Sequence, residues 1–122
     1  MDVLVVVGVG GMGETIARRQ AVGRKTVLAD FNEVALEATA EKMRVDGFDV
    51  VTAKIDVSSR ESVERVAALA ASLGPVAQVV HTELARLYRT VFLLGILCEF
   101  VGRAVVQRGV HSHRVVFVNV AE

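Results

Sequence analysis

The sequence predicts a single α/β domain built on a mainly parallel, doubly wound sheet that helices cover on both faces. Three observations lead to this fold class. Short valine-rich blocks without polar alternation recur along the chain, as is typical of strands buried on both sides. Longer segments with helical spacing separate these blocks, and glycines or N-capping residues mark most of the borders. Strands that alternate with helices in this way form right-handed crossovers and therefore a parallel sheet.

The first half of the chain is expected to run strand, helix, strand, helix. The valine block near the start and the apolar segment before Asp30 suit buried strands. Gly23 ends the first helix, while Asn32 is a suitable N-cap for the second helix and Gly47 terminates it. The expected ranges are 3–7, 14–22, 26–29 and 32–46.

The second half is expected to begin with a strand that ends just before Asp56. Ser58 and Glu61 have the S-x-x-E spacing of a capping box, and Gly74 with Pro75 ends the helix that they open. A further strand, a long helix and a final strand complete about five strands and four helices. The final strand is expected to leave an unpaired edge. The expected ranges are 49–55, 58–73, 76–81, 83–108 and 114–120.

The composition supports one globular domain over residues 1–122. With 52% hydrophobic residues the chain can bury a core, and 14 basic against 14 acidic side chains leave no net charge. The lack of a basic excess argues against a nucleic-acid partner, and no apolar run reaches the length of a membrane span. A single cysteine and the lack of a basic segment after Met1 favour a cytoplasmic protein without a disulfide framework.

A glycine-rich turn joins the first strand to the first helix. Gly8, Gly10 and Gly13 have the spacing G-x-G-x-x-G. The first glycine allows a tight exit from the strand, the second lets backbone approach a pyrophosphate, and the third lets the helix pack closely on the sheet. A helix that begins here directs its N–H groups and its positive dipole end at the phosphates. The motif therefore predicts a dinucleotide site in a Rossmann-like sheet.

An acidic residue follows the second strand. Asp30 lies 20 residues beyond Gly10, near the offset at which a carboxylate accepts hydrogen bonds from an adenosine ribose. This carboxylate would repel a 2′-phosphate, so NAD is favoured over NADP as the cofactor. In the alternative interpretation, the glycines form only a tight turn and Asp30 caps the next helix.

Three short segments within residues 3–81 carry a family resemblance. They are Gly8 followed by Gly11-Met12-Gly13 with the helix start Glu14-Thr15-Ile16-Ala17-Arg18, the acidic Asp30, and Asp56-Val57-Ser58. Together they are similar to the cofactor-binding half of the short-chain dehydrogenase/reductase family. The resemblance implies that Asp30 holds the adenosine ribose, that Phe31 belongs to the cofactor site, and that Asp56 and Val57 line the adenine pocket. It also implies hydride transfer between NAD(H) and an alcohol or carbonyl.

The resemblance weakens where the family has its catalytic groups, and we assign no catalytic residue. The segment after the fourth strand reads His81-Thr82, for which contact with the nicotinamide side and a structural role both stay open. The family's Tyr-x-x-x-Lys pair has no counterpart, because the single tyrosine, Tyr88, is followed four residues later by Phe92. Two hypotheses follow: an NAD-binding protein of this type, or a non-catalytic, truncated or engineered module for dinucleotide binding or dimerisation.

The carboxyl-terminal part adds predictions about partners and metals. The segment 83–108 is apolar on nearly all sides, and the resembling family often pairs this helix with a partner's, so a homodimer is expected. His111 and His113 form H-x-H, yet no acidic residue or cysteine lies near them in the sequence to complete a site. Cys98 stands in an apolar run, as an inert buried thiol would. No metal site is predicted.

Overall fold

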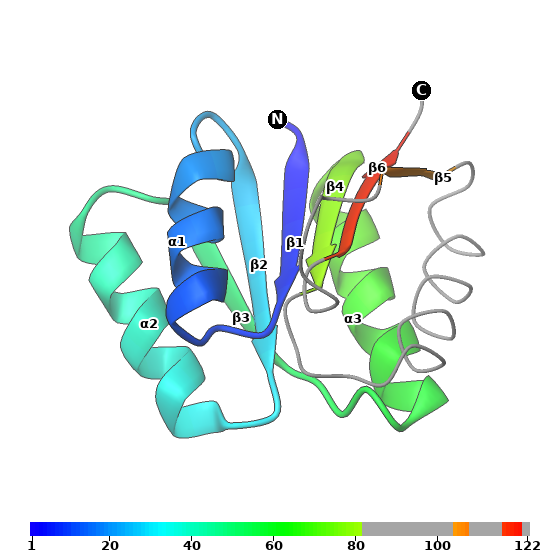
Figure 1. The fold of residues 1–122 in the computed structure, drawn as a ribbon, viewed down its shortest axis with the longest axis horizontal. Helices are drawn as coiled ribbons and strands as arrows, with labels where there is room; N and C mark the ends of the chain where they lie inside the picture. The colour runs from blue at the N-terminus through cyan, green and yellow to red at the C-terminus, as the bar shows by residue number, and fades with distance from the viewer. Residues whose placement is uncertain (82–103, 108–115, 121–122) are drawn as a thin grey trace.

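A computed structural model of the chain describes residues 1–81, 104–107 and 116–120 (Figure 1). Strands and helices alternate from the start of the chain to the fourth strand, as the sequence predicts. The strands are β1 Val3–Val7, β2 Lys25–Asp30, β3 Val50–Lys54, β4 Val76–His81, β5 Ala104–Gln107 and β6 Val116–Val120. The helices are α1 Gly11–Gln20, α2 Glu33–Val45 and α3 Arg60–Leu73.

The strands form one sheet in the order β3-β2-β1-β4-β6-β5. Strands β3, β2, β1 and β4 are parallel, and the chain moves outward from β1 first in one direction and then in the other. This doubly wound arrangement confirms the predicted fold class. Beyond β4 the sheet becomes mixed, because β6 runs antiparallel to β4 and β5 runs antiparallel to β6.

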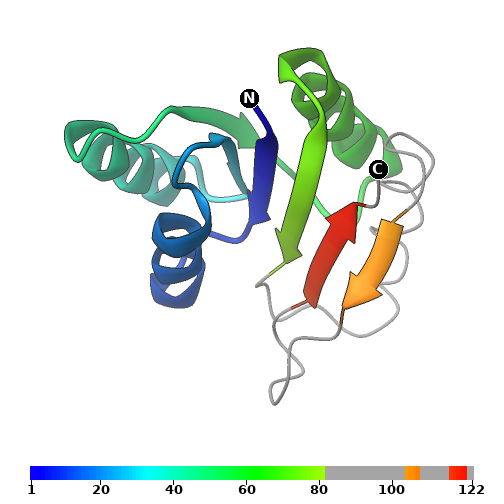
Figure 2. The same ribbon diagram turned by 90° about the horizontal axis from the view of Figure 1, so that it is seen from above.

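Two apolar cores cover the two faces of the sheet. Alternate residues of β1 point to opposite sides, so Leu4 and Val6 join the core with α1 and α2, whereas Val5 joins the core with α3. Figures 1 and 2 show α1 and α2 on one face and α3 on the other. Every residue of β1 is buried, which explains why this strand needs no polar alternation.

The starts of α1 and α2 differ in how well the sequence predicts them. Asn32 caps α2 as expected, with its side-chain oxygen accepting hydrogen bonds from the N–H groups of Val34 and Ala35, both at 3.1 Å. Helix α1 begins earlier than predicted, at Gly11, because Gly10 takes the N-cap position. The glycine turn is therefore shorter than expected, and its last glycines belong to the helix.

The cap of α3 corrects a prediction. Ser59, and not Ser58, is the N-cap, and its Oγ accepts a hydrogen bond from the N–H of Ser62 at 3.3 Å. Ser58 donates instead from its N–H and Oγ to Oδ1 of Asp56, at 3.0 and 2.6 Å. The preceding aspartate thus captures Ser58 in a turn of its own, and the capping role passes to the next residue.

The carboxyl-terminal part overturns two predictions. Most of the predicted helix 83–108 lies outside the described residues, but residues 104–107 form strand β5 and not the end of a helix. Val105 and Val106 are β-branched and favour the extended conformation when a neighbouring strand is present to pair with them. Strand β6 consequently lies between β4 and β5, so the unpaired edge expected at residues 115–120 does not exist.

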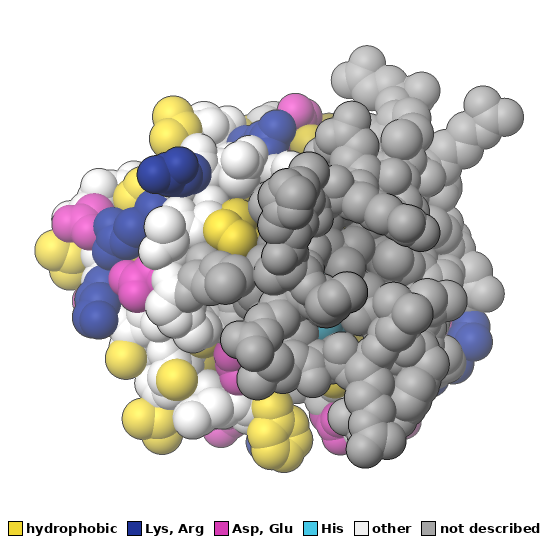
Figure 3. All heavy atoms as spheres, viewed as in Figure 1, with side chains coloured by type: hydrophobic (Ala, Val, Ile, Leu, Met, Phe, Trp, Pro, Cys, Tyr) yellow, Lys and Arg dark blue, Asp and Glu magenta, His cyan; other side chains and the backbone are white. Residues whose placement is uncertain are grey.

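Charged side chains cover the described surface in a mixed pattern. On the face shown in Figure 3, basic and acidic side chains lie next to one another over the α1 and α2 side of the molecule. The predicted pair of Glu14 and Arg18 is present at 3.3 Å, and Arg18 also binds Asp46 at 2.6 Å. Opposite charges are thus paired locally around Arg18.

Candidate functional site

The glycine turn lies at the carboxyl end of β1, in the centre of the parallel strands. Gly8 has a φ of 95°, a left-handed conformation that strongly favours glycine. Its N–H donates to the carbonyl oxygen of Ala29 at 2.8 Å, which ties the turn to the end of β2. The sequence assigns Gly8 to the tight exit from the strand, and its backbone angle accords with that role.

Gly10 and Gly11 stand in open space at the surface of the turn. A Cβ added to either residue would meet no described atom within 4 Å. Gly10 has an ordinary φ of −59°, so its backbone conformation does not demand glycine. Since nothing in the described fold explains these two glycines, the space beside them fits a ligand that approaches the backbone closely.

The start of α1 is suited to bind an anion. Helices α2 and α3 are capped by side chains of Asn32 and Ser59, whereas the N-cap of α1, Gly10, makes no side-chain capping bond. The first N–H groups of a helix have no partner within the helix, and the positive end of the dipole lies there. Gly11, Met12 and Gly13 supply these N–H groups, so their backbone can hold a phosphate.

Asp30 connects the glycine turn to the beginning of α2. Its Oδ2 accepts a hydrogen bond from the N–H of Val9 at 2.9 Å, and its Oδ1 accepts one from the N–H of Asn32 at 2.9 Å. Each oxygen keeps a further lone pair for a donor outside the protein. The structure therefore brings the predicted ribose acceptor directly against the predicted phosphate-binding turn.

The residues predicted to bind adenine lie after β3, the neighbour of β2. The N–H of Ile55 donates to the carbonyl oxygen of Asp30 at 3.1 Å, which holds the exit of β3 beside the end of β2. Asp56 follows in a turn that its own Oδ1 stabilises through Ser58, and Val57 is 9% exposed. Phe31, by contrast, is 61% exposed, so its ring is available to a ligand at this edge.

His81 ends β4 in register with Val7, the last residue of β1. Its side chain is buried, and burial lowers the pKa of the imidazole below 6.5. Its Nε2 finds no hydrogen-bond partner within the described ranges. The imidazole therefore stands at this edge in its neutral form, with its Nε2 enclosed in the structure. Thr82, Tyr88, Cys98, His111 and His113 lie outside the described residues.

Sequence reasoning missed one residue at this edge, Lys54. It is the last residue of β3 and pairs in parallel register with Asp30. Its Nζ lies 5.3 Å from the centre of the Phe31 ring and 4.0 Å from Oε1 of Glu33. Only the pairing of β2 with β3 reveals this proximity, although the position of Lys54 two residues before Asp56 is a signal that the sequence contains.

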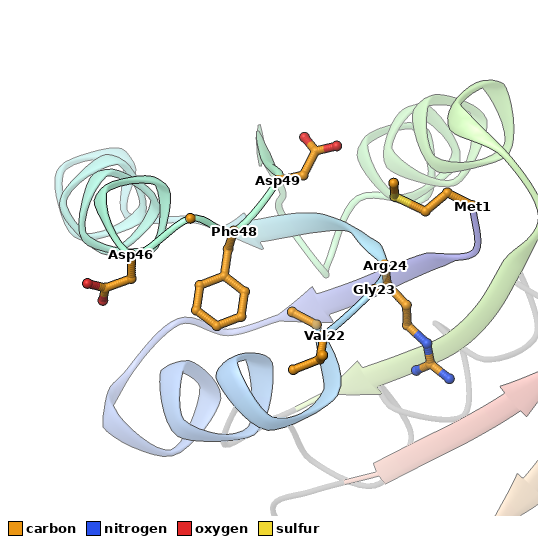
Figure 4. A pocket seen from close by; sticks show the side chains of 9 residues that line it. Met1, Val22, Gly23, Arg24, Asp46, Phe48 and Asp49 are labelled. Carbon is orange, nitrogen blue, oxygen red and sulfur yellow. The ribbon is translucent and has the colours of Figure 1, made fainter.

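A hollow lies at the edge of the sheet opposite the glycine turn. It has a volume of about 300 Å³, and Figure 4 shows Met1, Arg24 and Asp49 around it. These residues precede β1, β2 and β3, so the hollow marks the amino ends of the parallel strands. Ligands of doubly wound sheets bind beyond the carboxyl ends. We therefore place the candidate site at the glycine turn and not in this hollow.

The described part of the chain holds neither of two further classes of site. Within it, no three histidine, cysteine or acidic side chains come close enough together to hold a metal ion. No helix among the described residues has the length and apolar character needed to cross a membrane. The glycine turn, Asp30 and the exit of β3 are therefore the features on which a functional assignment depends.

A curated protein matches part of the chain closely. The short-chain dehydrogenase/reductase bsc3 of Alternaria brassicicola is 42% identical over 77 residues, which are 63% of this chain and 28% of that protein. The chain thus spans less than a third of this relative's length. No protein-family model matches the sequence.

Solved structures extend the match to the fold. A short-chain dehydrogenase/reductase from Burkholderia phymatum in complex with NAD has a TM-score of 0.66 and 26% identity, over 81% of this chain and 42% of that chain. An actinorhodin polyketide ketoreductase with NADPH has a TM-score of 0.66 and 20% identity, over 82% of this chain and 46% of that chain. In sequence and in fold, the chain matches the amino-terminal half of the short-chain dehydrogenases/reductases, which confirms the resemblance found in the sequence.

Proposed function

We propose that this chain binds NAD at the carboxyl edge of its parallel strands, as the cofactor-binding part of a short-chain dehydrogenase/reductase. The observation that carries the proposal is the hydrogen bond of 2.9 Å between the N–H of Val9 and Oδ2 of Asp30. It holds a ribose acceptor beside a helix start whose N-cap residue, Gly10, supplies no side-chain cap. Phosphate and ribose are adjacent groups in a dinucleotide, so one ligand can use both features.

The residues present fit such a ligand. The open space at Gly10 and Gly11 admits the pyrophosphate, and the N–H groups at the start of α1 would hold it. Asp30 would accept the ribose hydroxyls, while Phe31, Asp56 and Val57 would line the adenine. Bound NAD would supply hydride transfer, and His81, which ends β4 at this edge, is proposed for the nicotinamide side. Thr82 is proposed for the same side from the sequence alone.

NAD is proposed over NADP on the charge of Asp30. Both oxygens of this carboxylate already accept backbone hydrogen bonds, so its position is fixed and it cannot easily move away from a 2′-phosphate. A 2′-hydroxyl donates to such a carboxylate, whereas a phosphate is repelled. The matching fold occurs in relatives with NAD and with NADPH, so the fold itself accommodates either dinucleotide.

Calorimetric titration with NAD and NADP tests the binding site. The chain is expected to bind NAD more tightly than NADP, and Asp30→Ala is expected to weaken NAD binding by about tenfold or more, since a charged acceptor is lost. Asp49→Ala is the matched control, because Asp49 is an exposed carboxylate at the amino edge of the sheet. Equal NAD affinity in wild type and Asp30→Ala would refute the assignment of Asp30.

For activity we propose hydride transfer between NAD(H) and an alcohol or carbonyl, the reaction of the family. A second candidate, a non-catalytic dinucleotide-binding module, is favoured by one observation: the single tyrosine, Tyr88, has Phe92 where the family has its lysine. An assay of NADH absorbance with a panel of ketones and alcohols separates the two. Turnover that Asp30→Ala abolishes supports the enzyme, and NAD binding without turnover supports the module.

Assembly and location belong to the same proposal. We propose a homodimer formed through the rest of the predicted helix, 83–103, because its sequence is apolar on nearly all sides, whereas residues 104–107 pair within the sheet as β5. Light scattering at micromolar concentration tests this, and a monomer would contradict it. A cytoplasmic location is proposed from the single cysteine, which accords with a reducing compartment.

A further inference from the structure

We propose that Lys54 determines how strongly this chain discriminates between NAD and NADP, by offering its ammonium to the 2′ position of the adenosine ribose. The inference rests on the proposed dinucleotide site at Asp30. Lys54 and Asp30 are the last residues of adjacent strands and are paired in parallel register. The backbone of Lys54 therefore lies beside that of the proposed ribose acceptor, at the edge where the ligand would bind.

The side chains of both residues project to the same face of the sheet. Along β2, Leu28 belongs to the core under α1 and α2, and Asp30 follows two residues later on the same side. Along β3, the Oγ1 of Thr52 donates to Glu37 of α2 at 2.7 Å, and Lys54 again follows two residues later. The last residues of β2 and β3 thus direct their charged side chains toward the face of the sheet that α2 covers.

Two neighbours hold Lys54 without neutralising it fully. The ring of Phe31, 5.3 Å from Nζ, attracts the ammonium through its electron-rich face. The ion pair with Glu33 is 4.0 Å long and exposed, so it is weak. The Lys54 side chain is 54% exposed and can turn toward a phosphate while its stem stays against Phe31.

The charges at this edge explain why Lys54 affects only one of the two cofactors. Around the proposed ribose position, Asp30 and Glu33 carry two negative charges and Lys54 carries one positive charge, and Asp56 adds a further negative charge in the turn after β3. A neutral 2′-hydroxyl needs only the acceptor Asp30, so removal of the cation changes its binding little. A 2′-phosphate meets these carboxylates, and Lys54 is the group that offsets part of this repulsion. NADP therefore binds more weakly than NAD, yet measurably.

The test is calorimetric titration of wild type, Lys54→Met and Lys25→Met with NAD and with NADP. Lys54→Met is expected to lower the NADP affinity by about tenfold, because one charge-assisted hydrogen bond is lost, and to leave the NAD affinity within about twofold. Lys25→Met is the matched control, since Lys25 begins β2 at the opposite edge and pairs with Asp49. Lys25→Met is expected to change neither affinity. The length of β2 separates Lys25 from Asp30 by roughly 16 Å, at about 3.3 Å per residue, and this exceeds the screening length of about 8 Å.

A second variant tests whether the Phe31 ring positions the Lys54 ammonium. Phe31→Leu keeps the ammonium but removes the ring. Because Phe31 is also proposed to line the adenine, the readout is the ratio of NADP to NAD affinity, which is expected to fall by about threefold. Equal losses for NAD and NADP in Lys54→Met, no loss for either, or an undetectable affinity of wild type for NADP would each overturn the role of Lys54 while NAD binding stands. If wild type binds neither dinucleotide, the proposed function itself fails and this inference fails with it.

Discussion

At the scale of single residues, the site combines the carboxylate of Asp30, which hydrogen bonds hold in place, with the imidazole of His81, whose Nε2 makes no described hydrogen bond. Asp30 is held from both sides by backbone N–H groups, at 2.9 Å each. His81 is buried at the same edge, and its Nε2 lacks a partner among the residues that the structure describes. A buried polar atom without a hydrogen bond is unfavourable, so His81 should respond to pH.

The folding stability is expected to depend on His81 below neutral pH. Burial lowers the pKa of the native imidazole below the ordinary 6.5, so the unfolded chain binds the proton more tightly. The contribution of His81 is therefore fully present above pH 6.5 and is lost as the pH falls through the lowered native pKa. His81→Asn, which cannot be protonated, should lose less stability on acidification.

Urea unfolding of wild type and His81→Asn at neutral pH and at about pH 5 measures this difference. The neutral-pH measurement is the control, since it separates the loss of packing from the effect of protonation. Parallel pH profiles for the two proteins would contradict the prediction.

At the scale of elements, the start of α1 differs from the starts of α2 and α3. Side chains of Asn32 and Ser59 cap the latter two, whereas Gly10 and Gly11 leave α1 open to whatever approaches it. A helix start of this kind trades some local stability for access of a ligand to the backbone.

Gly11→Ala should separate stability from binding. Gly11 is in the first turn of α1, and the added methyl group meets no described atom within 4 Å. Alanine favours the helix, so the free energy of unfolding should stay unchanged or rise by up to about 1 kcal/mol. The methyl group occupies the space proposed for the pyrophosphate, so NAD affinity should fall by about tenfold. Thermal unfolding and calorimetry give the two values, and unchanged NAD affinity would refute the proposed placement.

The elements differ in how far the sequence predicts them. The parallel strands are predictable because their valine runs are buried on both faces, and α2 because Asn32 and Gly47 mark its ends. The strand β5 is not, since Val105 and Val106 stand in an apolar run whose periodicity suits a helix equally well. Only pairing with β6 decides between the two conformations.

The residues of the candidate site also differ in how far the sequence predicts them. The glycines and Asp30 are recognisable because their spacing along the chain reflects a local strand-turn-helix geometry. Lys54 is not recognisable, because its place beside Asp30 depends on the register between β2 and β3. The spacing of the dinucleotide motif reports the contact of Asp30 with the glycine turn, whereas no motif spacing reports Lys54, whose place requires the pairing of β2 with β3.

At the scale of the whole molecule, β1 supports both cores and both halves of the sheet. It pairs with β2 on one side and β4 on the other, and its side chains enter the cores on both faces. The glycine turn continues directly from this strand. The fully buried strand β1 therefore leads directly into a turn whose Gly10 and Gly11 are exposed.

Val5→Ala tests the central role of β1. Val5 is 1% exposed and belongs to the core with α3. Removal of two buried methyl groups should lower the free energy of unfolding by about 2 kcal/mol. Val22→Ala is the control, because Val22 is 75% exposed, and its change should stay within about 0.5 kcal/mol. Denaturant unfolding measures both, and equal small changes would contradict a core centred on β1.

The two hydrogen bonds to Asp30 have a consequence for the thermodynamics of recognition. They join the turn after β1 and the beginning of α2 into one preorganised unit before any ligand arrives. Association then requires little ordering of the backbone, so the entropic cost on the protein side is small. Adenosine-containing ligands should consequently bind without a slow rearrangement step, and their association should follow a single exponential whose rate rises linearly with ligand concentration.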